Sequence, residues 1–274
     1  MPDFHMLDFQ ELCRDETSRR AFLTRMAAAG LGTAALGLFQ GGYGARPAQA
    51  TGKQLLDIVT TPDNERFPGI PGRSMNERVL NFALTLETLE ADLYRQALNL
   101  AAGKDIGTPL PEDVSSYELS IPPGYLPPPH PQMGFTYLQQ FAAVEAAHRD
   151  FLRAAIQQMG GTPVGPNPGG YRAPFGTTLR SILEVILLVE ETGVRAYLGA
   201  AGAITDLKLT QTAASIYSTE ARHSSVLKRT LIQDPSPTRM LGDAQVTPRQ
   251  RGEYDFEFFQ TPEQILKSVQ PFLA

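Results

Sequence analysis

Apolar residues recur at intervals of three and four over four long stretches of the chain, which is the spacing of an amphipathic helix. No stretch alternates convincingly with a period of two, so the pattern predicts no β-sheet. We expect helices of roughly 25 residues, or about 40 Å, at 74–102, 135–159, 178–204 and 206–233. Helices of similar length with apolar faces pack most simply as a four-helix bundle, so the predicted fold class is all-α.

Start and stop signals support these helices. Ser74 and Glu77 have the spacing of a capping box at the start of the first helix, and Gly103 ends that helix. The third and fourth helices are separated by only a few residues, so they should be antiparallel neighbours.

Long connectors rich in proline and glycine separate the other helices. The connector between the second and third helices is long enough to run back along the bundle. After residue 233 the pattern becomes irregular, apart from one short helix predicted at Pro262–Val269. We therefore expect a four-helix bundle at 74–233 and an irregular C-terminal extension at 234–274.

The N-terminus has the three parts of an export signal. A basic pair at Arg19 and Arg20 precedes a weakly apolar stretch rich in Ala and Gly, and a small-residue cleavage site ends at Ala50. The segment SRRAFL at 18–23 resembles the twin-arginine export signal. We predict a signal peptide at 1–50, which is cleaved after Ala50 or retained as an anchor, followed by an N-terminal extension at 51–73. The expected location is the periplasm or cell envelope, and the export machinery is the expected partner.

Composition narrows the chemistry. The net charge of -5 and the lack of a long basic run give no reason to expect nucleic acid as a partner. The only cysteine, Cys13, lies in the predicted signal, so the mature chain would contain no thiol. A metal ion would then have to be held by carboxylates and imidazoles.

Two tetrapeptides have the same form, a glutamate followed three positions later by a histidine. They are EAAH, at Glu145 to His148, and EARH, at Glu220 to His223. On a helix this spacing places both side chains on one face, about one turn apart. A single pair of this kind is usually a solvated surface pair, but two of the three histidines beyond residue 50 belong to one.

An internal repeat adds two further glutamates. The first and third helices align without a gap, LTLETLEADLY against LLVEETGVRAY, which places Glu87 over Glu190 and Tyr94 over Tyr197. Each half of the chain thus offers one glutamate and one Glu-x-x-His pair. Glu90 and Glu191 compete as ligands, because each lies within a turn of the chosen residue, and Glu191 is the stronger alternative. The remaining histidine, His130, lies in LPPPHPQ, where we expect a loop that faces water, and we assign it no role.

Four carboxylates and two imidazoles suit two divalent ions a few ångströms apart. This set resembles that of the ferritin-like superfamily, in particular its exported members with a twin-arginine signal, over about residues 75–233. The resemblance implies two iron or manganese ions, with the Glu-x-x-His carboxylates bridging and each lone glutamate capping one ion. It also implies that the two tyrosines contact the centre, although both are equally explained as core aromatics. The implied ligands are Glu87, Glu145, His148, Glu190, Glu220 and His223.

Three functions fit this set. The first is an oxidoreductase that reacts with dioxygen or peroxide, as a ferroxidase or catalase does. The second is metal binding or storage, and the third is stress protection without metal or turnover. The residues do not distinguish iron from manganese, and they leave the oligomeric state open, a homo-oligomer included.

Overall fold

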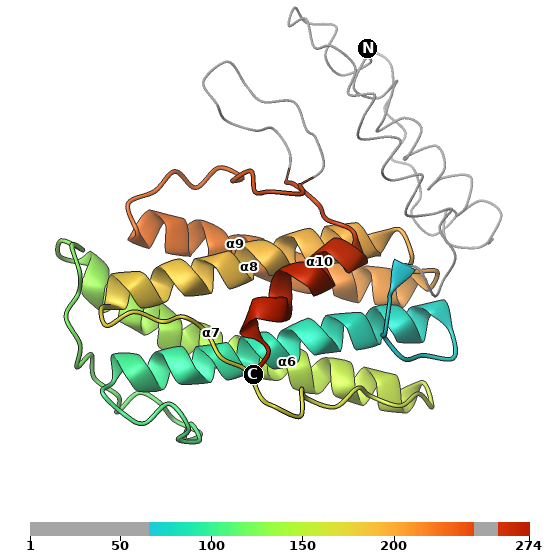
Figure 1. Ribbon diagram of the computed structural model, residues 1–274, viewed down its shortest axis with the longest axis horizontal. Helices are drawn as coiled ribbons and strands as arrows, with labels where there is room; N and C mark the ends of the chain where they lie inside the picture. The colour runs from blue at the N-terminus through green and yellow to red at the C-terminus, as the bar shows by residue number, and fades with distance from the viewer. Residues whose placement is uncertain (1–65, 244–256) are drawn as a thin grey trace, which may run out of the picture. The chain divides into compact units, whose positions relative to one another are not determined.

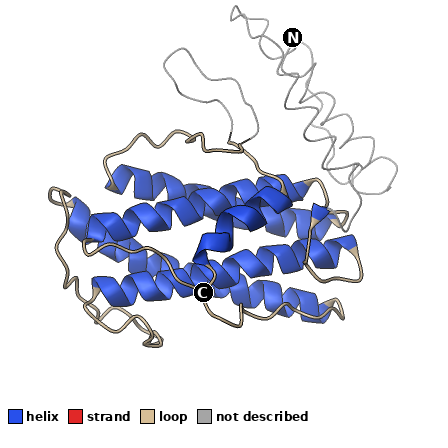
Figure 2. Cartoon of the chain, in the orientation of Figure 1, coloured by secondary structure: helices blue, strands red, loops and turns tan. Residues whose placement is uncertain are grey.

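A computed structural model describes residues 66–243 and 257–274, which belong to one compact unit, Asp57–Ala274. The predicted signal at 1–50 and residues 51–65 lie outside the described residues. The described part contains five α-helices and no β-strand (Figure 2), which confirms the all-α fold class. The helices are α6 (Met75–Ala101), α7 (His130–Gln158), α8 (Leu179–Ala201), α9 (Leu207–Thr230) and α10 (Pro262–Val269), and a 3-10 turn at Gln270–Phe272 follows.

The four long helices form the expected bundle, with α6 packed on α7 and α8 packed on α9 (Figure 1). The connector at 159–178 runs back along the bundle, so that α7 and α8 point in the same direction. Helices α6 and α8, which carry the two lone glutamates, are therefore antiparallel. None of the helices in the described ranges combines the length and apolar character that a membrane span requires.

Side-chain caps begin three of the four long helices. Thr178 and Ser181 form a reciprocal capping box at α8, and Asp206 accepts the N–H of Leu209 at α9. At α6 only half of the predicted box exists. Ser74 accepts the N–H of Glu77, but the Glu77 carboxylate instead accepts the backbone N–H groups of Arg73 and Thr162. This glutamate therefore joins the start of α6 to the connector at 159–178.

Helix α7 begins five residues before its predicted start, and the expectation that His130 lies in a water-facing loop is wrong. His130 is the first residue of α7, is partly buried, and has a buried Nδ1 without a hydrogen-bond partner. The sequence pattern missed this first turn because it contains Pro131 and Gly134, residues that usually mark a loop. Proline is tolerated in a first helical turn, and a Cβ on Gly134 would lie 2.7 Å from Leu183, so this glycine allows close packing.

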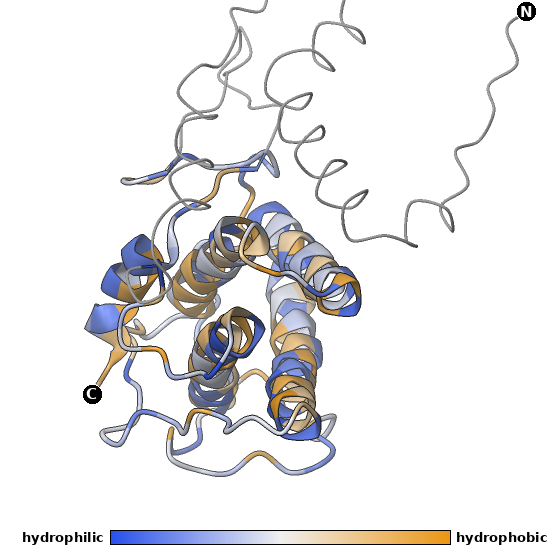
Figure 3. Ribbon diagram, turned by 90° about the vertical axis from the view of Figure 1, so that its right-hand side faces the viewer, coloured by the Kyte–Doolittle hydropathy of each residue, from blue (hydrophilic) through white to orange (hydrophobic). Residues whose placement is uncertain are grey.

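The core lies between the long helices, each of which carries both hydrophobic and hydrophilic residues (Figure 3). Several charged side chains are buried in the middle of this apolar core. Such burial costs free energy unless the charges are paired or bind a cation, so these residues indicate where function is located.

The C-terminal residues pack on the bundle. Helix α10 has the predicted bounds and lies against α8, with Ile265 and Val269 buried. The backbone N–H of Gln260 donates to the carbonyl of Arg195 at 3.4 Å. A Cβ on Gly199 would lie 1.7 Å from the carbonyl oxygen of Gln260, so only glycine permits this close approach.

Candidate metal centre

Four glutamates from four helices meet in the middle of the bundle. Glu87 of α6, Glu145 of α7 and Glu220 of α9 are each 0% exposed, and Glu190 of α8 is 1% exposed. Four carboxylates in one apolar core repel one another and lose hydration, so the arrangement requires positive charge nearby.

Two histidines direct their Nδ1 atoms at these carboxylates. His148 Nδ1 lies 2.9 Å from Glu145 Oε2 and 3.4 Å from oxygens of both Glu87 and Glu220. His223 Nδ1 lies 2.8 Å from Glu145 Oε1 and 3.3 Å from Glu190 Oε1. Each Glu-x-x-His pair therefore points inward, as helical spacing allows.

The six predicted residues form two overlapping groups, and within each group one potential ligand atom per residue lies within 4.8 Å of all the others. One group comprises Glu87, Glu145, His148 and Glu220, and the other comprises Glu145, Glu190, Glu220 and His223. Glu145 and Glu220 belong to both, which is the arrangement that bridging carboxylates require. The assignment of the six residues as ligands stays a prediction.

Unpartnered atoms show that this cluster fits metal ions. Both carboxylate oxygens of Glu220 and one oxygen each of Glu87, Glu145 and Glu190 are buried without a hydrogen-bond partner. His223 Nδ1 is also unpartnered, because its close approach to Glu145 lacks hydrogen-bond geometry. Buried polar atoms without partners are rare and costly, and carboxylate and imidazole donors together suit iron and manganese.

The electrostatics of the metal-free protein reflect the crowding of charge. Burial raises the pKa of Glu87 to about 7 against the opposing effect of the nearby His148, and burial also raises the pKa of Glu190 and Glu220 well above the usual range. Burial acts in the same direction on Glu145, but the hydrogen bond with His148 and the close approach of His223 lower its pKa below the usual value.

His148 responds in the opposite sense. Burial disfavours its charged form, but its hydrogen bond with Glu145 and the nearby carboxylates of Glu220 and Glu87 raise its pKa to about 12. The protonated imidazole therefore supplies positive charge to the metal-free cluster. A metal ion bound through Nδ1 would replace that proton and take over the same electrostatic role.

The two tyrosines cross between the halves of the bundle. Tyr94 of α6 donates its hydroxyl proton to Oε1 of Glu190 on α8, and Tyr197 of α8 donates to Oε1 of Glu87 on α6 at 2.5 Å. Seven residues span about 10 Å of helix, so this exchange of partners is possible because the two helices are antiparallel. Each hydroxyl orients one of the two lone glutamates.

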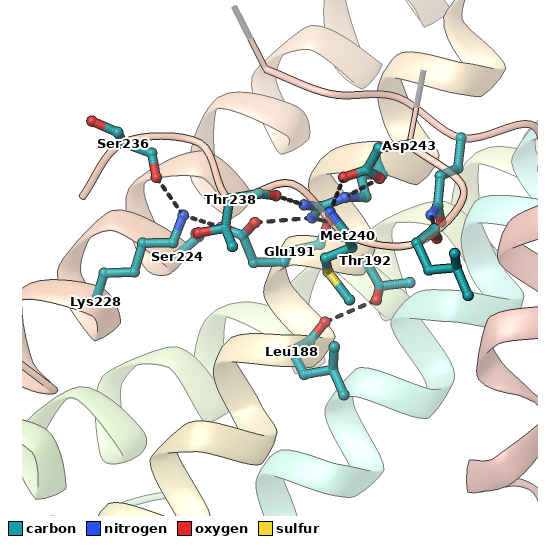
Figure 4. A network of polar contacts seen from close by, with 12 residues as sticks. Leu188, Glu191, Thr192, Ser224, Lys228, Ser236, Thr238, Met240 and Asp243 are labelled. Carbon is teal, nitrogen blue, oxygen red and sulfur yellow. Dashed lines mark hydrogen bonds and ion pairs between the residues drawn. The ribbon is translucent and has the colours of Figure 1, made fainter. Parts of the chain in front are cut away.

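Glu191, the stronger alternative to Glu190, belongs to a separate network of polar contacts (Figure 4). Its carboxylate lies 2.6 Å from Lys228 Nζ and 2.9 Å from Arg195, and it accepts a hydrogen bond from Ser224. These partners neutralise Glu191, which is absent from both clusters of potential ligands. Glu190 is thus the member of the adjacent pair that joins the centre.

The same network holds residues 234–243 on the bundle. Arg195 Nε lies 2.6 Å from Asp243 Oδ1, and Lys228 Nζ donates to the carbonyl of Ser236 at 2.9 Å. The four-residue spacing of Glu191 and Arg195 was a signal for their ion pair. No local pattern indicated that Lys228 and Asp243 would join it.

Two further buried residues lie beside the centre, although neither is among the six predicted ligands. The ring of Phe141, one turn before Glu145, stacks on the ring of His223 with centroids 3.7 Å apart and an interplanar angle of 21°. Nothing in the sequence distinguishes Phe141 from an ordinary core residue. Glu90, the weaker alternative to Glu87, is also buried, but it accompanies Glu87 and does not replace it.

Comparison with known proteins agrees with this architecture. A comparison with curated proteins finds no match. A family model described as the ferritin-like domain matches residues 76–233, which include all four long helices and all six predicted ligands. Because the match covers more than half of the chain, the protein belongs to the ferritin-like domain family.

Proposed function

We propose that this protein binds two iron or manganese ions and acts as an exported oxidoreductase toward dioxygen or peroxide. The observation that carries the proposal is the pair of donor groups sharing Glu145 and Glu220. Shared carboxylates hold two ions close together, and a pair of redox-active ions can supply two electrons to one oxidant.

The protein's own groups have distinct tasks in this proposal. Glu145 and Glu220 would bridge the two positions, while Glu87 with His148 and Glu190 with His223 would each complete one of them. Tyr197 and Tyr94 hold the lone glutamates in place through their hydroxyl protons. The surrounding apolar core excludes water, which strengthens every electrostatic interaction in the site.

The sequence also supports the proposed route of export. Arg19 and Arg20 in SRRAFL, together with the small-residue site ending at Ala50, match an export signal and lie outside the described residues. Export of the folded protein would allow metal loading before translocation. Replacing both arginines by lysine should keep the full-length chain in the cytoplasm, as measured by fractionation. Normal export of this variant would contradict the proposed route.

The burial of the centre also supports the alternative, a metal-binding or storage protein without turnover. The four glutamates are almost completely buried, and the His148 side chain is only 15% exposed. A centre enclosed in this way holds ions well but restricts access by an oxidant larger than dioxygen or peroxide.

One experiment separates these functions. Protein matured in its own host is analysed for bound metals and then tested, after reduction, for consumption of dioxygen and peroxide. Two iron or manganese ions per chain together with consumption would support the oxidoreductase, whereas the same metal content without consumption would support the alternative. Protein that contains neither metal and cannot bind either would exclude both.

Matched variants connect the result to the centre. Glu145→Ala combined with Glu220→Ala should abolish metal binding, because it removes both shared ligands. The control is Glu184→Ala, which removes an exposed carboxylate of α8 that pairs with Arg180. Metal content that survives the double substitution would show that the ligand assignment is wrong.

A further inference from the structure

Glu90 is a fifth buried glutamate beside the proposed centre. It lies on α6 one turn after Glu87, is 3% exposed, and has a buried Oε2 without a hydrogen-bond partner. An isolated buried carboxylate is costly, and Glu191 shows how this fold neutralises one with cationic side chains. No ion pair of Glu90 is seen within the described residues, so its position requires another explanation.

The carboxylate of Glu90 lies in the electrostatic field of the four glutamates of the centre. Burial is the largest cause of its raised pKa, and the charges of Glu220, Glu87, Glu145 and Glu190 add to it, with Glu220 foremost. Glu90 is thus close enough to interact with all four glutamates of the centre.

Gly193 shows that space is reserved for this side chain. The internal repeat that places Glu87 over Glu190 and Tyr94 over Tyr197 also places Glu90 over Gly193. A Cβ on Gly193 would lie 3.0 Å from Glu90 Oε1 and 2.9 Å from Glu220 Oε2. The two halves therefore differ at this position, because the absence of a side chain on α8 leaves room for two carboxylates.

We propose that Glu90 is a seventh protein ligand of the centre, which coordinates an ion together with Glu220 and makes the two metal positions unequal. The inference rests on the dinuclear site of the proposed function. Four glutamates and two neutral imidazoles balance the charge of two divalent ions, and Glu90 adds one further negative charge. The position that Glu90 serves should bind its ion more tightly than the other.

The test uses metal-stripped protein titrated with Co²⁺ in the absence of oxygen, followed by visible absorption. The variants are Glu90→Gln, which keeps the shape, and Glu90→Ala, which removes the donor. We expect two Co²⁺ ions to remain bound, with one binding step weakened by about tenfold or more. The Co²⁺ bands should also intensify, because they strengthen as the coordination number falls.

Glu77→Gln is the matched control. Glu77 is a buried glutamate of the same helix, but its carboxylate accepts backbone N–H groups at the start of α6, more than two turns from Glu87. This variant should leave both the Co²⁺ affinities and the spectrum unchanged. Thermal unfolding of the metal-free variants provides a second readout, in which Glu90→Gln should be at least as stable as the unmodified protein.

The possible outcomes separate the two proposals. Variants of Glu90 with unchanged affinities and spectrum would overturn the seventh ligand while leaving the dinuclear site intact. A large loss of metal-free stability in Glu90→Gln would also overturn it, since it would assign Glu90 a structural role. Failure of the unmodified protein to bind Co²⁺ would instead refute the dinuclear site itself.

Discussion

The hydroxyl of Tyr197 donates a hydrogen bond to Oε1 of Glu87 at 2.5 Å, from the helix that lies antiparallel to the one carrying the glutamate. Tyr94 makes the reciprocal bond to Glu190. Each of the two lone glutamates, Glu87 and Glu190, is thus oriented by a tyrosine from the other half of the internal repeat. The two halves of the centre are coupled through these bonds as well as through the shared carboxylates.

Removal of either hydroxyl should weaken metal binding. In Tyr197→Phe, the ring still fills its space, but Glu87 loses the donor that orients it. We expect a decrease in Mn²⁺ or Co²⁺ affinity of roughly tenfold to a hundredfold, measured by competitive titration, and a similar decrease for Tyr94→Phe. Tyr217→Phe, at a half-buried position of α9, should have no effect. If all three variants bound the metal ion as tightly as the unmodified protein, the hydrogen bonds from Tyr197 and Tyr94 would not orient the ligands.

Neutralisation of Glu220 should stabilise the metal-free protein. Both of its carboxyl oxygens are buried without hydrogen bonds, and burial disfavours the charged form of this group. Glu220→Gln replaces it by an amide of the same shape that is neutral at every pH, so folding no longer has to bury a charge or take up a proton. In the presence of a chelator we expect a gain of about 1 kcal/mol or more in the free energy of unfolding, measured by urea denaturation.

Bound metal should reverse this order of stability, so that the unmodified protein becomes more stable than Glu220→Gln. At a free ion concentration of 100 times Kd, binding stabilises the unmodified protein by about 2.7 kcal/mol, whereas the variant has lost a shared ligand. A Glu220→Gln protein that is less stable than the original even with chelator would mean that the carboxylate contributes to folding without metal.

The metal-free protein should lose stability as the pH rises from about 5 to 8. Burial raises the folded-state pKa of four glutamates above the ordinary value of 4.5. The pKa of Glu87 rises to about 7, and those of Glu90, Glu190 and Glu220 rise well above the ordinary value. The folded state therefore binds more protons than the unfolded state in this range, so the stabilisation present below pH 4.5 is lost as the pH passes each folded-state value.

The two other pKa shifts among the predicted ligands, those of His148 and Glu145, do not counteract this trend. The stabilisation from His148, whose pKa is raised to about 12, is complete below its ordinary value of 6.5 and also declines as the pH rises. The pKa of Glu145 is lowered, so its contribution is lost only toward acid pH. Urea denaturation with chelator at pH 5.5 and pH 8 measures the effect, and a more stable protein at pH 8 would contradict it.

Glu191 and Glu190 should respond to substitution in opposite ways. Glu191→Ala removes a partner from the buried Lys228 and Arg195 and should cost roughly 3 kcal/mol of stability. Its metal content should nevertheless remain at two ions per chain. Glu190→Ala should lose one ion, as determined by metal analysis after dialysis. Loss of metal in the Glu191 variant alone would reverse the assignment.

The helices were largely predictable because local signals agree with one another. Apolar periodicity located all four long helices, and the expected starts near Thr178 and Asp206 coincide with their N-caps. Helix α7 is the exception. Its first turn contains Pro131 and Gly134, which usually mark a loop, and packing against α8 and α9 outweighs that local preference.

The members of the centre were predictable for a different reason. The internal repeat constrains Glu87 and Glu190 together, and the Glu-x-x-His spacing constrains each pair on its own helix. The sequence alone does not show whether Glu190 or Glu191 is the predicted ligand, because that depends on which side chains the other helices place against each side of α8. Adjacent helical residues differ by about 100° in direction, and both faces of α8 carry partners.

Periodicity, caps and a repeated set of glutamates and histidines therefore account for the four helices and for the residues that converge between them. The pairing of Tyr94 with Glu190, the close approach of Glu90 and Glu220 at Gly193, and the ion pairs of Lys228 and Asp243 had no local signal. These contacts join residues far apart in the chain. They depend on the antiparallel packing of the helices, because buried charge is stabilised by whatever group that packing places beside it.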